Sequence, residues 1–443
     1  MSSPAPRGSR SRPVRTSQSI SPGRVAAFEI LTRVAAGKGH SDELLHSHLT
    51  AQLSPEDRNL ATALVMGTLR WQIALDARIA PLLSRPGQKL AEPVAIALRL
   101  GAFQLLHMDR IPAHAALNES VELCRAAGHP HAAGMVNAVL RKLTGAVAAK
   151  AKLYELPAAF AERLAHSRWL VERWISTYGR DAALAICEYD QHEPPDGSLF
   201  PADAALPQID DGSRLVAELA AAALPSVQQP RIWDACAAPG GKTLILAARA
   251  PEAEILATDI SARRLTAMQR RLEKYVYAAR VRAEVLDAAA VSPTSATQYD
   301  LILCDLPCSG TGTLARNPEI RLRLEPTELA RQAARQRAIL ENALRHLVPG
   351  GRLVYSTCSL EPEENEAVVE PLIERGDVQQ LPIEPLIEKL VASSLLPAGS
   401  ADLLLRTAVR NVALRTLPGI HPCDGFYATV LARKSLHRSA ATS

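Results

Sequence analysis

The sequence predicts two parts of different fold class, an all-helical N-terminal half and a C-terminal α/β half with a mostly parallel sheet. In residues 24–143 apolar side chains recur three and four positions apart, and strand-like alternation is nearly absent, as expected of helices. After about residue 229, short β-rich runs alternate with helical segments, which is the pattern of βαβ units with right-handed crossovers. A glycine-rich turn follows the first of these runs, at the place where doubly wound sheets bind ligands.

The composition is that of a globular protein with two or three domains. The chain has 443 residues, 47% hydrophobic and 22% charged, and its 50 basic and 46 acidic side chains leave a net charge of +4. This balance excludes a histone-like polycation and an acidic disordered chain. No run approaches the roughly 20 apolar residues of a membrane span, and the N-terminal tail lacks the apolar core of a secretory signal. Seven scattered cysteines argue against a disulfide framework and favour a reducing cytoplasm.

The N-terminal half is expected to begin with a tail and to continue with helices. Residues 1–23 are rich in Ser, Pro, Gly and Arg and contain no acid, so we expect a disordered basic tail. The run Ser54-Pro55-Glu56-Asp57 is expected to open a helix, with Ser54 as its N-cap and the acids in its first turn. Two or three further helices are expected in residues 150–195, and the weakly patterned stretch 196–208 is expected to be a linker.

The C-terminal half is expected to alternate strands and helices. The runs with strand character are 231–235, 254–259, 281–286, 299–305 and 352–357. The helices expected between them include residues 242–249, 262–273 and 327–347.

The turn after the first strand is expected to hold a cofactor. It lies in the run Asp234-Ala-Cys-Ala-Ala-Pro-Gly-Gly-Lys-Thr243, and its two glycines allow a ligand to approach the backbone closely. Cys236 stands where a phosphate-binding P-loop requires glycine, and the G-x-G-x-x-G pattern is absent, so binding of a nucleoside triphosphate or of NAD is disfavoured. The predicted cofactor contacts of this turn are Cys236, Ala237, Ala238, Pro239, Gly240, Gly241 and Lys242.

Three carboxylates are expected at the carboxyl ends of successive strands. Asp259 ends the second strand, 18 residues after Gly241, as does an acid that binds ribose hydroxyls. Asp287 ends the third strand, near where an adenine edge would lie, and Asp305 ends the fourth. Any one of these residues could instead cap a helix, which is the commoner role, but three at strand ends favour a nucleoside cofactor. Arg264 completes the predicted cofactor site.

Two cysteines are expected beside the same crevice. Cys308 follows the fourth strand and Cys358 follows the fifth, and these strands are neighbours in the usual doubly wound order. Cysteines at the ends of strands are often buried packing residues. Two at the ends of adjacent strands, one of them in a glycine-rich loop, favour a catalytic role instead. No metal is expected, because Cys304 and Cys308 lack zinc-knuckle spacing and no paired histidines accompany them.

A thiol beside a nucleoside cofactor and an aspartate suits methylation of cytosine at C5. That carbon is a poor nucleophile, but addition of a thiolate to C6 makes it enamine-like and able to attack an electrophilic methyl group. A partner must bind or protonate N3 of the base, and Asp305 is the candidate. A base must then remove the C5 proton so that the thiol can leave.

These motifs closely resemble the RNA cytosine-5 methyltransferases. The resemblance rests on three ordered motifs: the run Cys236-Ala-Ala-Pro-Gly-Gly-Lys-Thr, the run Asp305-x-Pro-Cys308-Ser-Gly-Thr-Gly, and Thr357-Cys358-Ser-x-x-x-Glu363-Glu364-Asn365. It implies S-adenosylmethionine as cofactor, Cys358 as the nucleophile, and Cys308 as the residue that assists release of the methylated RNA. DNA cytosine methyltransferases use the cysteine of the Pro-Cys motif instead, so the Thr-Cys motif points to RNA.

The helical half is similar to the NusB-type RNA-binding fold. The similar runs are Arg24-Val-Ala-Ala-Phe-Glu-Ile-Leu, Gly67-Thr-Leu-Arg70, Leu100-Gly-Ala-Phe-Gln-Leu-Leu106, Ile111-Pro-Ala-His114 and Val136-Asn-Ala-Val-Leu-Arg141, and a C-terminal signature is Asp424-Gly-Phe-Tyr-Ala-Thr-Val430. This layout resembles the bacterial RsmB (Sun/Fmu) family of 16S rRNA methyltransferases, with a class I Rossmann-like catalytic domain. It implies a tail (1–23), a NusB-like domain (24–145), a helical linker with a shortened RRM-like segment (146–209), a methyltransferase domain (210–435) and a tail (436–443).

The resemblance implies a cytoplasmic enzyme, a monomer without membrane contact, that methylates C5 of a cytosine in 16S rRNA. The alternatives are the same chemistry on tRNA or another rRNA, and a catalytically weak RNA-binding or ribosome-assembly factor. A set of seven arginines after the Cys308 loop is expected to favour phosphate contacts over a merely solvated helix face. These residues are Arg316, Arg321, Arg323, Arg331, Arg335, Arg337 and Arg345.

Overall fold

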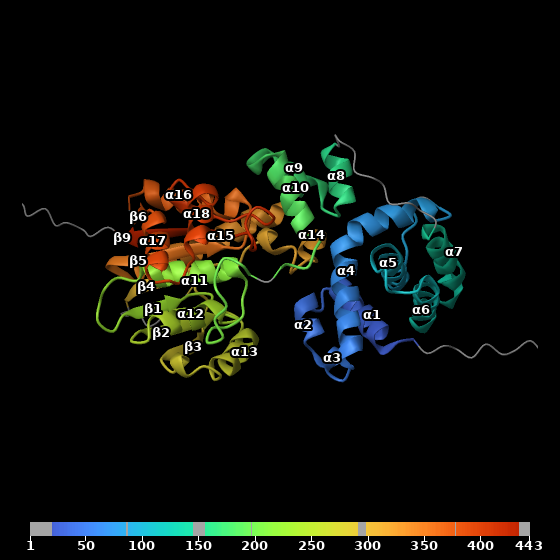
Figure 1. Ribbon diagram of the computed structural model, residues 1–443, viewed down its shortest axis with the longest axis horizontal. Helices are drawn as coiled ribbons and strands as arrows, with labels where there is room; N and C mark the ends of the chain where they lie inside the picture. The colour runs from blue at the N-terminus through green and yellow to red at the C-terminus, as the bar shows by residue number, and fades with distance from the viewer. Residues whose placement is uncertain are drawn as a thin grey trace, which may run out of the picture. The chain divides into compact units, whose positions relative to one another are not determined.

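The structure is a computed structural model that describes residues 20–85, 87–144, 156–195, 197–290, 298–376 and 378–433. The chain divides into two compact units, residues 1–150 and 151–443 (Figure 1). Nearly all of the predicted basic tail and the C-terminal tail lie outside the described residues. Among the described residues, no helix is both long and apolar enough to cross a membrane.

The first unit is helical throughout its described residues. Its α-helices are α1 (Pro22–Ala35), α2 (Ser41–Leu45), α3 (His48–Ala51), α4 (Pro55–Ile79), α5 (Glu92–His107), α6 (Ala113–Ala126) and α7 (Ala133–Leu143). The predicted start of α4 is confirmed, because the Ser54 hydroxyl accepts a hydrogen bond from the Asp57 amide at 3.1 Å. The NusB-like all-α expectation agrees with this unit.

A buried polar group ties the first helix of this unit to two others. The Arg24 guanidinium on α1 donates to Gln104 Oε1 on α5 at 2.7 Å and to Glu119 Oε1 on α6 at 3.1 Å. The Glu119 carboxylate also accepts from the backbone amide of Ser21 at 2.8 Å, just before α1 begins. Because Arg24 is buried, these bonds are needed to satisfy its charge, and they specify how α1 meets α5 and α6.

The second unit begins with a small helical bundle. It consists of α8 (Pro157–Arg163), α9 (Arg168–Tyr178) and α10 (Arg180–Tyr189), within the segment where two or three helices are expected. The described residues between 197 and 209 belong to no helix or strand. They lead into α11 (Asp211–Ala223), which Asp210 caps by accepting a hydrogen bond from the Gly212 amide at 2.7 Å.

In its described residues, the rest of the second unit is built on a nine-stranded sheet. Its strands are β1 (Arg231–Asp234), β2 (Glu254–Asp259), β3 (Val281–Val285), β4 (Tyr299–Asp305), β5 (Leu347–Thr357), β6 (Val378–Leu381), β7 (Val409–Arg410), β8 (Ala413–Arg415) and β9 (Tyr427–Arg433). The order along the sheet is β3-β2-β1-β4-β5-β9-β8-β7, and β6 also pairs with β9. Strands β1 to β5 are mutually parallel, as predicted, and β4 and β5 are neighbours.

The antiparallel end of this sheet is absent from the sequence-based prediction. Strand β9 runs antiparallel to β5 and to β6 and β8, so the last described segment of the chain lies beside the strand that ends at Thr357. Strand β5 also begins five residues earlier than expected, and the preceding helix ends at Arg345 rather than at residue 347. Strands β6, β7 and β8 have four residues or fewer and give no clear pattern in the sequence, whereas the seven-residue β9 has an apolar run that the prediction overlooked.

Helices cover both faces of the sheet. The remaining α-helices are α12 (Gly241–Arg249), α13 (Ala262–Leu272), α14 (Ile320–Arg323), α15 (Pro326–Arg345), α16 (Glu366–Glu374), α17 (Glu384–Ala392) and α18 (Ala398–Thr407). On one face Leu219 of α11 and Ile387 of α17 share a core with Ile232 and Val354 of the sheet. On the other face Leu340 of α15 and Val368 of α16 pack with neighbouring strand residues. The carboxyl ends of β1, β2, β4 and β5 therefore meet at one edge between the two layers.

Candidate active site

The turn between β1 and α12 approaches the next strand through its backbone. The Ala237 amide donates to the Thr258 carbonyl of β2 at 2.8 Å. Gly240 has a φ of +91°, a left-handed conformation that favours glycine, and it directly precedes α12. Arg264 of α13 donates to the Ala238 carbonyl, so one predicted cofactor residue holds the turn formed by the others. The turn thus lies at the carboxyl edge of the sheet, directly before the start of a helix.

Two of the three predicted carboxylates lie at the ends of the neighbouring strands β2 and β3. Asp259 is the last residue of β2 and is buried; its Oδ1 accepts from the Ser261 amide at 2.8 Å, and its Oδ2 lies 3.3 Å from Arg264 Nη1. Asp287 lies two residues beyond the end of β3, where it accepts from the Ala289 amide at 3.0 Å. The Asp259 carbonyl accepts from the Leu286 amide at 3.2 Å, which brings the two segments together.

Sequence reasoning missed a fourth carboxyl group at this edge. Asp234 ends β1 and is buried, and it accepts a hydrogen bond from the Thr243 hydroxyl at 2.6 Å. Burial raises the pKa of Asp234 to about 7. The available signal was its place as the last residue of a strand and the first of the glycine-rich motif.

Asp305 at the end of β4 is held between a lysine and a serine. Its Oδ2 lies 2.8 Å from Lys242 Nζ, and its Oδ1 accepts from the Ser356 hydroxyl on β5 at 2.7 Å. Lys242 also donates to the Ser213 hydroxyl at 2.7 Å, and its amine lies 5.1 Å from the centre of the Phe426 ring. Burial opposes the charge of Lys242, but Asp305 and the other acids nearby outweigh it and raise the pKa of the lysine. Lys242 therefore remains a cation beside Asp305.

The two predicted cysteines lie in contact. Cys308 Sγ and Cys358 Sγ are 3.3 Å apart, and both residues are free thiols that are partly exposed. The hydrogen bond with Cys358, together with burial, raises the pKa of the Cys308 thiol. Cys308 thus stays protonated and can donate its S–H to the sulfur of Cys358.

A buried glutamate joins the two loops that carry these thiols. Glu364 accepts from the Ser309 amide at 2.8 Å, from the Ser359 hydroxyl at 2.5 Å and from Gln336 Nε2 on α15 at 3.2 Å. Burial raises the pKa of Glu364, although all of these donors lower it. The sequence motif contains Glu364, but sequence reasoning assigned it no role.

The Cys308 loop also approaches the segment before β9. The Gly312 amide donates to the Cys358 carbonyl at 2.9 Å, and the Gly425 amide donates to the Gly312 carbonyl at 2.7 Å. A Cβ atom at Gly312 would lie 2.1 Å from the Gly425 carbonyl oxygen, so no other residue fits there without movement. This contact brings Phe426 to Lys242 and closes the site on the side of the antiparallel strands.

The structure corrects the expectation for the arginines after the Cys308 loop. Arg321 is fully buried and donates to backbone carbonyls, so the predicted phosphate contact is wrong for this residue. Arg316 is exposed but pairs with Asp424 at 2.9 Å and with Asp210 at 3.1 Å. The side chains that lie on the surface are Arg316, Arg323, Arg331, Arg335, Arg337 and Arg345.

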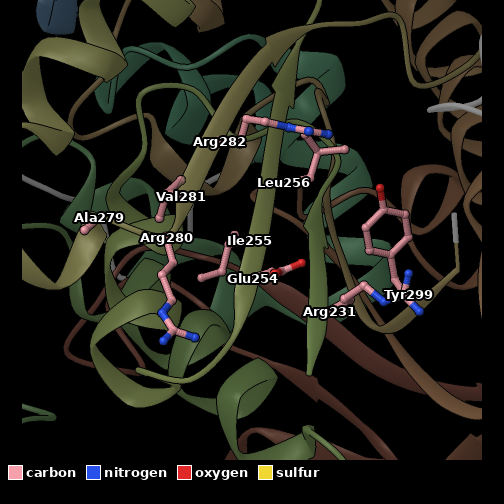
Figure 2. A pocket seen from close by; sticks show the side chains of 9 residues that line it. All are labelled: Arg231, Glu254, Ile255, Leu256, Ala279, Arg280, Val281, Arg282 and Tyr299. Atoms are coloured by element: carbon pink, nitrogen blue, oxygen red, sulfur yellow. The ribbon is translucent and has the colours of Figure 1, made fainter. Parts of the chain in front are cut away.

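A separate cavity of about 490 Å³ lies at the opposite edge of the sheet. Figure 2 shows its side chains, which come from the first residues of β1 to β4 and from the segment before β3. Two of its three arginines face acids: Arg282 lies 2.9 Å from Glu284, and Arg280 lies 3.7 Å from Glu252. The charges are locally matched, and the cavity is remote from the thiols at the carboxyl edge.

Within the described ranges, no group of three or more His, Cys, Asp and Glu side chains is arranged to hold a metal ion. The chemistry at the carboxyl edge is that of two thiols, an aspartate–lysine pair, and carboxylates next to a glycine turn. This set suits nucleophilic attack on a base beside a bound nucleoside.

Comparison with protein families assigns both units. Residues 221–432 match the family described as 16S rRNA methyltransferase RsmB/F, and residues 21–145 match the NusB family.

Several curated proteins are similar over nearly the whole chain. The "Probable ribosomal RNA small subunit methyltransferase B" of Bacillus subtilis (strain 168) is 30% identical, over 93% of this chain and 98% of that protein. The "Ribosomal RNA small subunit methyltransferase B" of Xanthomonas campestris pv. campestris is 31% identical, over 93% of this chain and 97% of that protein. Among solved structures, the crystal structure of PH0851 is 19% identical with a TM-score of 0.70, and the match covers 94% of this chain and 100% of that one. The last similarity concerns the fold.

Proposed function

Because the chain belongs to the RsmB/F family of 16S rRNA methyltransferases, we propose that it methylates C5 of a cytosine in 16S rRNA through a covalent bond to Cys358. Membership of the family makes it an S-adenosylmethionine-dependent rRNA methyltransferase. The proposal adds the target atom, the choice of 16S rRNA, and the residues that act. The proposed location of the protein is the reducing cytoplasm, where its seven free cysteines stay reduced.

The residues at the end of β1 and β2 fit S-adenosylmethionine. Asp259 ends β2 as a buried carboxylate and suits ribose hydroxyls, while Asp287 beyond β3 suits the adenine edge. The left-handed conformation of Gly240 shapes the turn that follows β1, where the amino-acid part of the molecule would bind. When bound, S-adenosylmethionine supplies an electrophilic methyl group on a positively charged sulfur.

The observation that carries the proposal is the contact between the two sulfurs, 3.3 Å apart, beside Asp305. We assign the attack on C6 of the base to Cys358, which reacts as a thiolate and lies within reach of the Cys308 S–H. Attack forms the Cys358–C6 bond and moves the electron pair of the C5–C6 double bond toward C5 and the N3 side of the ring. The cationic Lys242 stabilises the negative charge that develops there, and Asp305 accepts a hydrogen bond from N3 once that nitrogen is protonated.

Methylation of C5 and release of Cys358 follow. When the cofactor is bound, C5 would take up its electrophilic methyl group. A base then takes the C5 proton, the electron pair of that C–H bond restores the C5–C6 double bond, and the bond from C6 to Cys358 breaks. Cys308 is placed for this release step, because its sulfur contacts the sulfur that leaves.

The choice of 16S rRNA is supported by the first unit and by the relatives. Residues 21–145 match the NusB family, and the curated relatives are named as small-subunit ribosomal RNA methyltransferases. Exposed arginines on α15 would add salt-dependent phosphate contacts.

The test is transfer of a radiolabelled methyl group from S-adenosylmethionine to unmodified 16S rRNA and to bulk tRNA. We expect label in 16S rRNA with the wild-type chain and none with Cys358→Ala. Label in tRNA alone would refute the choice of substrate and keep the chemistry. Label from both proteins would refute the role of Cys358. The Cys308→Ala variant should accumulate a denaturation-resistant protein–RNA adduct, since the release step is slowed.

A further inference from the structure

The bundle of helices α8 to α10 shares its hydrophobic core with both thiol-bearing loops. Its buried residues include Phe160, Leu170 and Trp174, and two leucines from elsewhere in the chain pack among them. Leu314 belongs to the segment that follows Cys308, and Leu360 lies two residues after Cys358. One small core therefore receives one side chain from each loop.

Helix α9 binds the Cys358 loop through a buried carboxylate. Glu361 Oε2 accepts from Arg173 Nε at 2.8 Å, and Glu361 Oε1 accepts from Trp174 Nε1 at 3.0 Å. The same arginine reaches Glu363 at 2.6 Å. The side chain of Glu361 is 1% exposed, so the two donors of α9 are what make its charge tolerable there.

The same bundle binds the Cys308 segment through a buried cation. Arg321 Nη1 donates to the Ala165 carbonyl at 3.3 Å, and Nη2 donates to the Asp190 carbonyl at 3.2 Å. In return, the Ser167 hydroxyl donates to the Arg321 carbonyl at 2.9 Å. The end of α8, the start of α9 and the end of α10 thus all contact this one residue.

A shared attachment of this kind constrains the separation of the thiols. Each loop leaves a strand of the sheet at one end, is joined to the other loop by Glu364, and is anchored at its far side in the bundle. The sulfur contact of 3.3 Å depends on both loops having one position. Since enzymatic nucleophiles lose about 10²-fold in rate when misplaced by roughly 1 Å, such a support bears on the reaction.

We propose that helices α8 to α10 are a positioning element of the active site, and that Glu361 is the positioning residue through which α9 sets the geometry of Cys358 beside Cys308. This inference rests on the proposed role of Cys358. It gives a catalytic task to the segment that lies between the RNA-binding unit and the sheet in sequence.

The test uses Glu361→Gln in the full chain, because the amide keeps an acceptor for Trp174 and loses the charge that pairs with Arg173. We expect kcat for methyl transfer to fall about 10- to 100-fold, with KM for S-adenosylmethionine unchanged. Alkylation of Cys358 by iodoacetamide can be followed at its peptide by mass spectrometry. The pH dependence of its rate should differ from that of the wild type.

The matched control is Glu172→Gln on the same helix. Glu172 lies 2.7 Å from Arg168 on the exposed side of α9, and its loss should leave both readouts at the wild-type value. If Glu361→Gln does not fold, Trp174→Phe provides the same comparison, since it keeps a buried ring and removes one donor to Glu361.

Two outcomes overturn the proposal. A folded Glu361→Gln or Trp174→Phe chain with wild-type kcat and an unchanged alkylation profile would mean that the bundle serves stability alone. An equal loss in Glu172→Gln would mean that the effect is not carried by Glu361. Failure of the proposed function is separately visible, because transfer by Cys358→Ala would refute the nucleophile while the alkylation profile of Glu361→Gln remained readable.

Discussion

The two sides of the active edge are held by different kinds of contact. On the cofactor side, formed by the ends of β1 to β3, Asp259 is fixed by the amide of Ser261, two residues away. On the thiol side, formed by β4, β5 and the loops that follow them, Glu361 is held by Arg173, which lies 188 positions earlier. The first side is shaped by contacts between successive segments of the sequence, such as that of Arg264 with Ala238, and the second by contacts between residues more than 150 positions apart, such as those of Glu361 and Arg321. A substitution on the cofactor side should therefore weaken cofactor binding without moving the thiols, and a substitution on the thiol side should move the thiols without weakening cofactor binding.

The largest effect should come from the thiol side. Replacing Cys358 with alanine removes the proposed nucleophile, so methyl transfer should fall by at least about 10³-fold. The calorimetric affinity for S-adenosylmethionine should stay the same, because the thiol loop does not shape the cofactor turn. A weaker affinity in this variant would show that the two sides are coupled and would contradict the comparison.

A pair of matched leucines sharpens the same contrast. Leu360→Ala on the thiol side and Leu244→Ala on the cofactor side each remove a fully buried side chain, and each should lower the free energy of unfolding by about 2–5 kcal/mol. Leu360→Ala should reduce kcat and leave the affinity for S-adenosylmethionine unchanged. The Leu244 side chain packs in one core with Ala237 and Ala238 of the turn, so Leu244→Ala should weaken cofactor binding instead.

Chemical denaturation with calorimetry on the same samples would measure both effects. Equal losses of kcat and of affinity in the two leucine variants would show that the sides are coupled through the common sheet.

A smaller effect is expected from Asp259. Alanine at this position removes the hydrogen bonds proposed for the ribose, at a cost of about 1–3 kcal/mol in binding free energy. The value of kcat at saturating cofactor should remain near that of the wild type. Unchanged calorimetric affinity would place the ribose elsewhere.

The smallest effect is a dependence of stability on pH. Burial raises the pKa of Asp234 to about 7 in the folded chain, above its value in the unfolded chain. The folded state then binds more protons between about pH 4 and pH 7, so this group lowers stability as the pH rises through that range. The loss of thermal stability between pH 5 and pH 8 should be smaller for Asp234→Asn than for the wild type. A loss of the same size would assign the dependence to other groups.

The cofactor side could be predicted from the sequence because its contacts are local. The strand ends, the glycine turn and the spacing to Asp259 can be recognised along one stretch of the sequence. The parallel order of the strands then places Asp305 beside Ser356. The usual doubly wound strand order likewise indicated that Cys308 and Cys358 would lie beside the same crevice.

The supports of the thiols could not be predicted in this way. Arg321 sits in a run of arginines that looks like a phosphate-binding surface, and only the packing of α8 to α10 around it shows that it is buried. Glu361 is one of several acids after Cys358, and nothing in the spacing identifies Arg173 and Trp174 as its partners. Such contacts depend on the tertiary fold, which a single sequence does not encode as a local pattern.

The position of β9 has a consequence for how the chain is made. Strand β9 pairs with β5, the strand that leads to Cys358, yet it is synthesised about seventy residues later. At roughly 5–20 residues per second, the free edge of β5 waits on the order of ten seconds for its neighbour, exposed to strand pairing with other chains. The contact of Gly425 with Gly312 waits longer still, because more than a hundred positions separate the two residues. An enzyme that modifies ribosomal RNA thus depends on a translating ribosome to reach residue 433 before its own catalytic edge is complete.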